Sequence, residues 1–99
     1  MKNGIVIADA GPIISLAIVD KLDILSKIFD EVKIANAVWE EITIDESKPF
    51  VERVRAYFKD KVCSIRSFNE LTFIMDYGES ESLILYNEIE ANFILFDDK

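Results

Sequence analysis

The sequence predicts a three-layer α/β/α sandwich built on a mainly parallel four-stranded sheet. Four short apolar runs alternate with stretches whose apolar residues recur at helical spacing. Strands separated by helices are typical of a parallel sheet with crossover helices, and the near absence of charge in the runs indicates strands covered on both faces. The 99 residues suffice for one domain, 1–99. The expected strands are residues 4–8, 32–35, 62–65 and 93–96.

The first expected strand, residues 4–8, ends at Asp9. The Ala-Gly-Pro sequence that follows breaks it, and Pro12 suits the first turn of a helix that residues 13–17 continue. A second helical stretch places its apolar residues on one face, apart from Ile24. The residues of this stripe are Leu22, Leu25, Ile28 and Phe29.

After the next strand, Asn36 is expected to cap a helix through residues 38–42. The loop at residues 45–49 opens a further helix with a buried stripe and a basic face. The stripe comprises Phe50, Val51, Val54, Tyr57 and Phe58. The basic face carries Arg53, Arg55, Lys59 and Lys61, and two interpretations stay open for it, a solvated surface or an RNA contact.

The last third of the chain contains an expected helix and an expected strand. Gly78 and the acidic residues around it mark the start of the helix, and residues 82–89 carry apolar side chains at helical spacing. The strand at residues 93–96 then stops abruptly at Asp97 and Asp98. Acidic residues at this position lie where open α/β sheets keep their active sites.

The composition excludes several kinds of site. The net charge is −8 and the chain has no histidine, which removes Ser-His-Asp triads and His-ligated zinc. No apolar run approaches the roughly 18 residues needed to cross a bilayer, and the first strand leaves no room for a signal peptide. With a single cysteine, Cys63, these features lead us to expect a cytoplasmic protein.

Carboxylates follow the expected strands and begin the expected helices. If the first and last strands are neighbours, Asp9 meets Asp97 and Asp98 at one edge of the sheet. Such an edge binds Mg²⁺ or Mn²⁺ through oxygen ligands, and the ion restores positive charge where a phosphate must lie. The other acidic residues that topology directs to this edge are Glu40, Glu41, Glu79 and Glu81.

Each of these residues also has a structural interpretation. Asp9 suits a helix cap, and Glu79 and Glu81 suit the first turn of a helix because they complement its dipole. Glu40 and Glu41 fit a solvated helix face, and the final aspartates fit a solvated terminus. Ser82 is expected on a turn or a helix surface.

Four motifs in order resemble the PIN domain (PilT N-terminus) nucleases, in particular the branch related to virulence-associated (VapC-type) toxin ribonucleases. They are residues 7–17, IADAGPIISLA; residues 34–42, IANAVWEEI; residues 78–82, GESES; and residues 94–99, ILFDDK. The likeness runs through the whole chain, and the four motifs together are far more specific than any one of them.

The resemblance implies a Mg²⁺- or Mn²⁺-dependent ribonuclease that hydrolyses RNA phosphodiesters. It implies metal-binding acidic residues at Asp9 and Glu40, a third at Glu81 or alternatively Glu79, and a fourth at Asp97 or Asp98. It also implies a toxin component of a toxin–antitoxin system, with RNA as substrate and a cognate antitoxin as protein partner.

Family chains continue beyond the aspartate pair with another helix and an edge strand. We therefore expect a C-terminally truncated domain that lacks this last helix and strand, with an exposed edge strand that favours a homodimer. The alternative function is a catalytically inactive or degenerate module that binds only a protein partner or itself.

Overall fold

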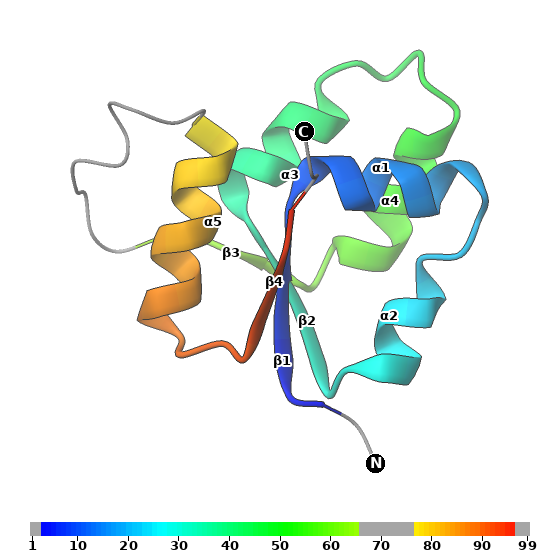
Figure 1. Ribbon diagram of the computed structural model, residues 1–99. Coiled ribbons are helices and arrows are strands. Elements are labelled where there is room, and N and C mark those ends of the chain that lie inside the picture. The colour runs from blue at the N-terminus through cyan, green and yellow to red at the C-terminus, as the bar shows by residue number, and fades with distance from the viewer. Residues whose placement is uncertain (1–2, 66–76, 97–99) are drawn as a thin grey trace.

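A four-stranded parallel sheet forms the centre of the protein. The computed structural model describes residues 3–65 and 77–96 (Figure 1). The strand order is β3-β2-β1-β4, and every pairing is parallel. The strands are β1 (Ile5–Ala8), β2 (Glu31–Ala35), β3 (Val62–Cys63) and β4 (Phe93–Leu95). The predicted α/β fold class is confirmed.

Helices cover both faces of this sheet. In Figure 1, α5 lies on one side of the strands and α1, α2 and α4 lie on the other, which gives the three layers. Helix α3 follows β2 directly and contacts both α5 and α4. The helices are α1 (Ala10–Ile18), α2 (Asp23–Ile28), α3 (Asn36–Thr43), α4 (Phe50–Phe58) and α5 (Tyr77–Glu88).

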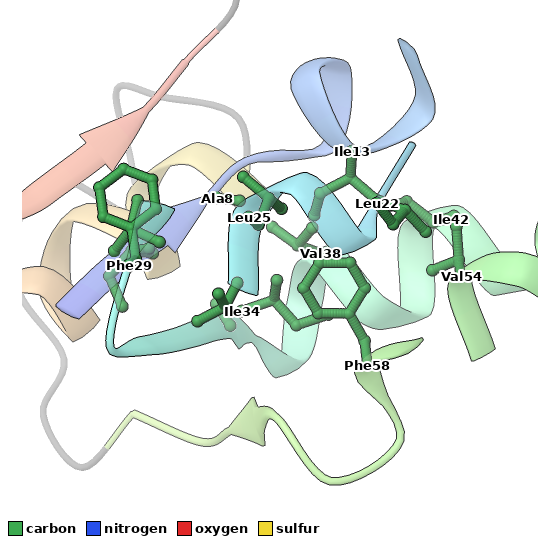
Figure 2. Packing of buried hydrophobic residues seen from close by; sticks show 14 of the residues in the cluster. Ala8, Ile13, Leu22, Leu25, Phe29, Ile34, Val38, Ile42, Val54 and Phe58 are labelled. Atoms are coloured by element: carbon green, nitrogen blue, oxygen red, sulfur yellow. The ribbon is translucent and has the colours of Figure 1, made fainter. Parts of the chain in front are cut away.

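The main core lies between the sheet and helices α1, α2, α3 and α4 (Figure 2). Val6 and Ile7 of β1 are completely buried, as expected for the central part of a sheet covered on both faces. The stripe of α4 also reaches this core through Val54 and Phe58. Burial of apolar side chains from every layer fixes the strand ends in space, and those ends carry the candidate site.

The register of β1 and β4 places Asp9 next to the end of β4. Ala8 pairs with Leu95, and the backbone N–H of Asp9 donates to the carbonyl of Leu95 at 2.9 Å. The first and last strands are therefore neighbours, which was the condition for Asp9 to meet the acidic residues after β4 at one edge.

Several local expectations were wrong. Asn36 is the first residue of α3 rather than its cap, because Ala35 occupies the N-cap position. Strand β3 pairs over two residues only. Strand β4 was expected to be covered on both faces. It is at the edge of the described sheet, and its residue Phe93 is 46% exposed. Ile28 ends α2 and is also exposed.

None of the helices within residues 3–65 and 77–96 is long and apolar enough to cross a membrane.

Candidate active site

Asp9 lies at the carboxyl end of the central strand and is 7% exposed. It occupies the N-cap position of α1 in an extended conformation, but its side chain makes no capping hydrogen bond to that helix. The helix-cap interpretation of Asp9 is therefore confirmed in position, without the hydrogen bond that a capping side chain makes.

Glu81 lies in the second turn of α5 and is 4% exposed. Its Oε1 accepts a hydrogen bond from the backbone N–H of Ala37, at 3.2 Å. Ala37 is the second residue of α3, where backbone N–H groups have no partner within the helix. The carboxylate of Glu81 thus serves the N-terminus of α3 rather than merely complementing the dipole of α5.

Asp9 and Glu81 lie at the same end of the sheet. Ile7 pairs with Lys33, so two residues further along each strand Asp9 is level with Ala35, the residue before α3. Neighbouring strands are about 4.8 Å apart, and Glu81 is bonded to Ala37, two residues beyond Ala35. Helix α5 also packs on β1 and β2. Two buried carboxylates are therefore brought to one edge.

Glu40 lies one turn into α3 and is exposed. Its Oε1 accepts a hydrogen bond from the Asn36 side-chain amide, at 3.1 Å. Glu41, the next residue, is also exposed. Both positions agree with a solvated helix face, and the Asn36 contact gives the Glu40 carboxylate a defined neighbour at the start of α3.

Three further predicted residues fall outside what the structure describes. Asp97 and Asp98 follow the last described residue, and the side chain of Glu79 is likewise not described. Among the residues that are described, no three histidine, cysteine or acidic side chains lie close enough to hold a metal ion together. A complete ligand set at this edge therefore requires residues beyond Asp9 and Glu81.

The predicted basic residues contact other parts of the protein. Arg53 donates to the carbonyls of Ala17 (2.8 Å) and Ile18 (3.1 Å), at the end of α1 opposite Asp9. Arg55 donates to Glu46 (2.9 Å) and Glu52 (3.1 Å), as well as to the Thr43 carbonyl. Lys59 is exposed. An RNA contact by these residues stays a prediction.

A groove of about 540 Å³ lies beside Arg53. It is near the end of α1, on the order of 13 Å along that helix from Asp9. The groove is consequently separate from the acidic edge. Its lining residues are Asp20, Leu22, Asp23, Arg53, Ala56 and Tyr57.

Ser82 is buried, and not on a turn or a helix surface as predicted. Its side chain is completely buried, and its hydroxyl has no hydrogen-bond partner among the described residues. The expectation of a surface position was wrong because Ser82 lies on the buried part of α5, beside Glu81, although neither side chain is apolar. No local signal in the sequence marks Ala37, whose role depends on its backbone alone.

At this edge, helix dipoles attract anionic groups, and anionic groups in turn attract cations. The N-termini of α1 and α3 both follow strand ends here, and each carries about half a positive charge from its aligned peptide dipoles. The positive end of a helix dipole attracts anionic groups. Ionised carboxylates in turn are the ligands that Mg²⁺ and Mn²⁺ prefer.

The donor set fits a hard divalent cation. Mg²⁺ usually keeps several waters and is bound through one or two carboxylates plus substrate phosphate oxygens. Asp9 and Glu81 supply two carboxylates at one edge. Soft metals are disfavoured at this edge, because the chain has no histidine and its only cysteine, Cys63, lies on β3.

Comparison with known families gives one match that covers nearly the whole chain. A family model described as a PIN domain matches residues 5–99. Comparisons with curated proteins and with solved structures gave no match. The match spans all the described strands and helices, from β1 to β4.

Proposed function

This chain belongs to the PIN domain family, and from that premise we propose that it is a Mg²⁺- or Mn²⁺-dependent ribonuclease. The PIN domain is a nuclease-type fold, and its members generally use divalent metal ions. The observation that carries the proposal is the pair of buried carboxylates, Asp9 and Glu81, at one edge of the sheet. The substrate would be RNA, and the reaction the hydrolysis of its phosphodiester bonds.

In this proposal Asp9 and Glu81 are the principal metal ligands. Asp97 or Asp98 adds a further carboxylate, and Glu40, exposed near the start of α3, faces the solvent from which substrate arrives. Glu79 is the alternative to Glu81. It has less support, because the structure describes the side chain of Glu81, which is buried, and does not describe that of Glu79. The bound ion would supply an activated water and stabilise the charge that develops on the phosphate.

The protein itself would orient these groups and move the proton. Burial of Asp9 limits the conformations of its side chain, and the Ala37 N–H holds Glu81. Because the chain has no histidine, a carboxylate at this edge is the group available to accept the proton of the attacking water. The phosphate backbone must approach a protein of net charge −8, so metal binding precedes productive RNA binding.

The proposed biological role is the toxin component of a toxin–antitoxin system, acting on RNA in the cytoplasm. A cognate antitoxin would be the protein partner, and a homodimer is the proposed assembly. Arg53, Arg55 and Lys59 are proposed to contribute to RNA binding. Of these, the exposed Lys59 has the most freedom to do so, since the two arginines already bind carbonyls and carboxylates of the protein.

The proposal is tested by cleavage of a mixed-sequence, single-stranded RNA with Mn²⁺, with Mg²⁺ or with a chelator. We expect cleavage only with metal, and a loss on the order of 100-fold or more in the Asp9→Asn variant. Asp23→Asn is the matched control, because it makes the same change on the exposed surface of α2, where Asp23 pairs with Lys27 at 3.5 Å.

Thermal unfolding provides a second measurement that does not depend on the substrate. A ligand that binds only the native state at 100 times its Kd stabilises it by about 2.7 kcal/mol, so millimolar Mn²⁺ should raise the Tm of the unmodified chain. The Asp9→Asn variant should lose this shift, and the Asp23→Asn variant should keep it. Absence of both cleavage and a Tm shift in the folded, unmodified protein would reject the metal site.

The second candidate function is a catalytically silent module that binds a protein partner or itself. Exposed apolar side chains at the end of α1 favour it, since Ile18 and Val19 are 58% and 60% exposed and Ile24 of α2 is 39% exposed. This candidate predicts a stable dimer or heteromer in light scattering, together with no RNA cleavage at saturating metal. Metal-dependent cleavage abolished by Asp9→Asn would exclude it.

A further inference from the structure

The contact between Glu81 and Ala37 joins two helices that are far apart in the sequence. Glu81 is 4% exposed, and its Oε1 accepts the Ala37 N–H at 3.2 Å. Burying an ionised carboxylate is costly unless hydrogen bonds or a counter-charge compensate for the lost hydration. The N–H groups in the first turn of α3 provide such compensation, because they are free donors at the positive end of a helix dipole.

The compensation comes from a neutral donor rather than from a cation. Among the described residues, no lysine or arginine forms an ion pair with Glu81, and Oε1 is the only one of its oxygens that accepts a hydrogen bond. A lysine in this place would cancel the negative charge and compete with a metal ion. A backbone N–H fixes the carboxylate and leaves its charge in place.

We infer that the backbone N–H of Ala37 is a positioning group for the metal site, which holds Glu81 through Oε1 so that the second oxygen is presented to a divalent cation. The inference rests on the proposed function, because it takes the acidic edge to be a metal site. Ligating carboxylates are commonly held by outer hydrogen bonds of this kind, and loss of such a partner costs about 10- to 100-fold in metal affinity.

A purely structural role makes a different prediction. If Glu81 only caps α3, then removing the Ala37 N–H lowers the stability of the protein and leaves the affinity for metal unchanged. The two roles are therefore separated by measuring metal affinity on folded variants, with stability measured in parallel.

The decisive variant is Ala37→Pro, which removes the N–H at a first-turn position where no hydrogen bond within the helix is lost. The matched control is Ala37→Gly, which loosens the helix at the same residue and keeps the N–H. The probe is Mn²⁺ alone, titrated into each chain and followed by the loss of the electron paramagnetic resonance signal of the free ion. We expect about a 10-fold or larger rise in Kd for Ala37→Pro and no more than about a twofold change for Ala37→Gly.

Equal Mn²⁺ affinities for Ala37→Pro and the unmodified chain would overturn the positioning role and leave the ribonuclease proposal standing. Failure of the unmodified chain to bind Mn²⁺ would overturn both. If Ala37→Pro does not fold, amide hydrogen exchange at Ala37 in the unmodified chain decides the question. We expect this amide to stay protected when Mg²⁺ is added, whereas faster exchange would show that Glu81 leaves Ala37 to bind the ion and would overturn the inference.

Discussion

The two ends of the sheet differ in how their polar groups are hydrogen-bonded. At the amino end, Gly4 and Asp30 form a reciprocal pair, in which the Gly4 N–H donates to Asp30 Oδ2 at 2.9 Å and the Asp30 N–H donates to the Gly4 carbonyl at 2.8 Å. Ile5 and Asn92 form a second reciprocal pair, with both distances 2.9 Å. These exposed groups therefore satisfy one another's hydrogen bonds at the amino end of the sheet.

At the carboxyl end, Glu81 and Ser82 are buried and have few hydrogen-bond partners among the described residues. Glu81 and Ser82 are 4% and 0% exposed, and among the described residues they receive one hydrogen bond between them, from Ala37. Asp9 is 7% exposed, and its side chain makes no capping hydrogen bond to its own helix. Local rules of stability are followed at the amino end and broken at the carboxyl end, as expected where a protein keeps its functional groups.

The largest expected effect is at the amino end. Gly4 has φ +91°, and a Cβ there would lie 2.2 Å from Asn92 Oδ1. Gly4→Ala should therefore lower the free energy of unfolding by about 2–4 kcal/mol, through backbone strain and loss of the Asn92 contact. Urea denaturation measures the change. In the background of Asn92→Gly, which removes the clashing side chain, the same substitution should cost clearly less; an equal cost would show that strain alone is responsible.

A smaller effect of opposite sign is expected at the carboxyl end. Ser82→Ala removes a buried hydroxyl that has no partner among the described residues, and should raise the free energy of unfolding by about 1 kcal/mol. Ser26→Ala makes the same change where the hydroxyl is hydrogen-bonded to the Tyr57 hydroxyl, and should lower it by about 1 kcal/mol. A loss of stability for Ser82→Ala would remove the contrast between the two ends.

The smallest expected effect concerns the exposed carboxylate of Asp45, which lies at neither end of the sheet. Hydrogen bonds from Ser47 hold the pKa of Asp45 below its ordinary value of 3.8. The bond from the Ser47 hydroxyl has the larger effect and the bond from the Ser47 N–H the smaller one. This contribution to stability is present above pH 3.8 and is lost as the pH falls through the lower folded-state pKa. Ser47→Ala should bring the pKa of Asp45 back toward its ordinary value in an NMR titration.

Asp60 provides the internal reference for that titration, because the neighbouring Lys61 lowers its pKa independently of Ser47. An unchanged pKa of Asp45 in the Ser47→Ala variant would show that the hydroxyl is not the main cause.

The order of elements was predictable because each depends on a local pattern. The uncharged run before Asp9 and the periodic stripe of α4 both appear within a few residues of sequence, and both form as expected. The edge position of Phe93 was not predictable, because strand order depends on which strands pair across the whole chain.

The candidate site was predictable in its residue types and less so in its contacts. Asp9 and Glu81 are identified by position, at the end of a strand and the start of a helix. The cap of α3 was assigned to Asn36 because capping is usually local, yet the acceptor is Glu81, 44 residues away. Arg53 was expected to be solvated or to contact RNA. It instead donates to a carbonyl at the end of α1, and this contact also joins residues that are far apart in the sequence.

The central position of β1 also determines when the protein is able to fold. This strand precedes the other described strands in the chain, yet one of its two edges pairs with residues 93–95. Contacts that span most of a chain are slow to form, because closing such a long loop costs more entropy than local pairing does. A nascent chain that has not yet reached β4 therefore exposes an unpaired edge of its most buried strand, which makes this intermediate the stage at which aggregation or chaperone binding is most favoured.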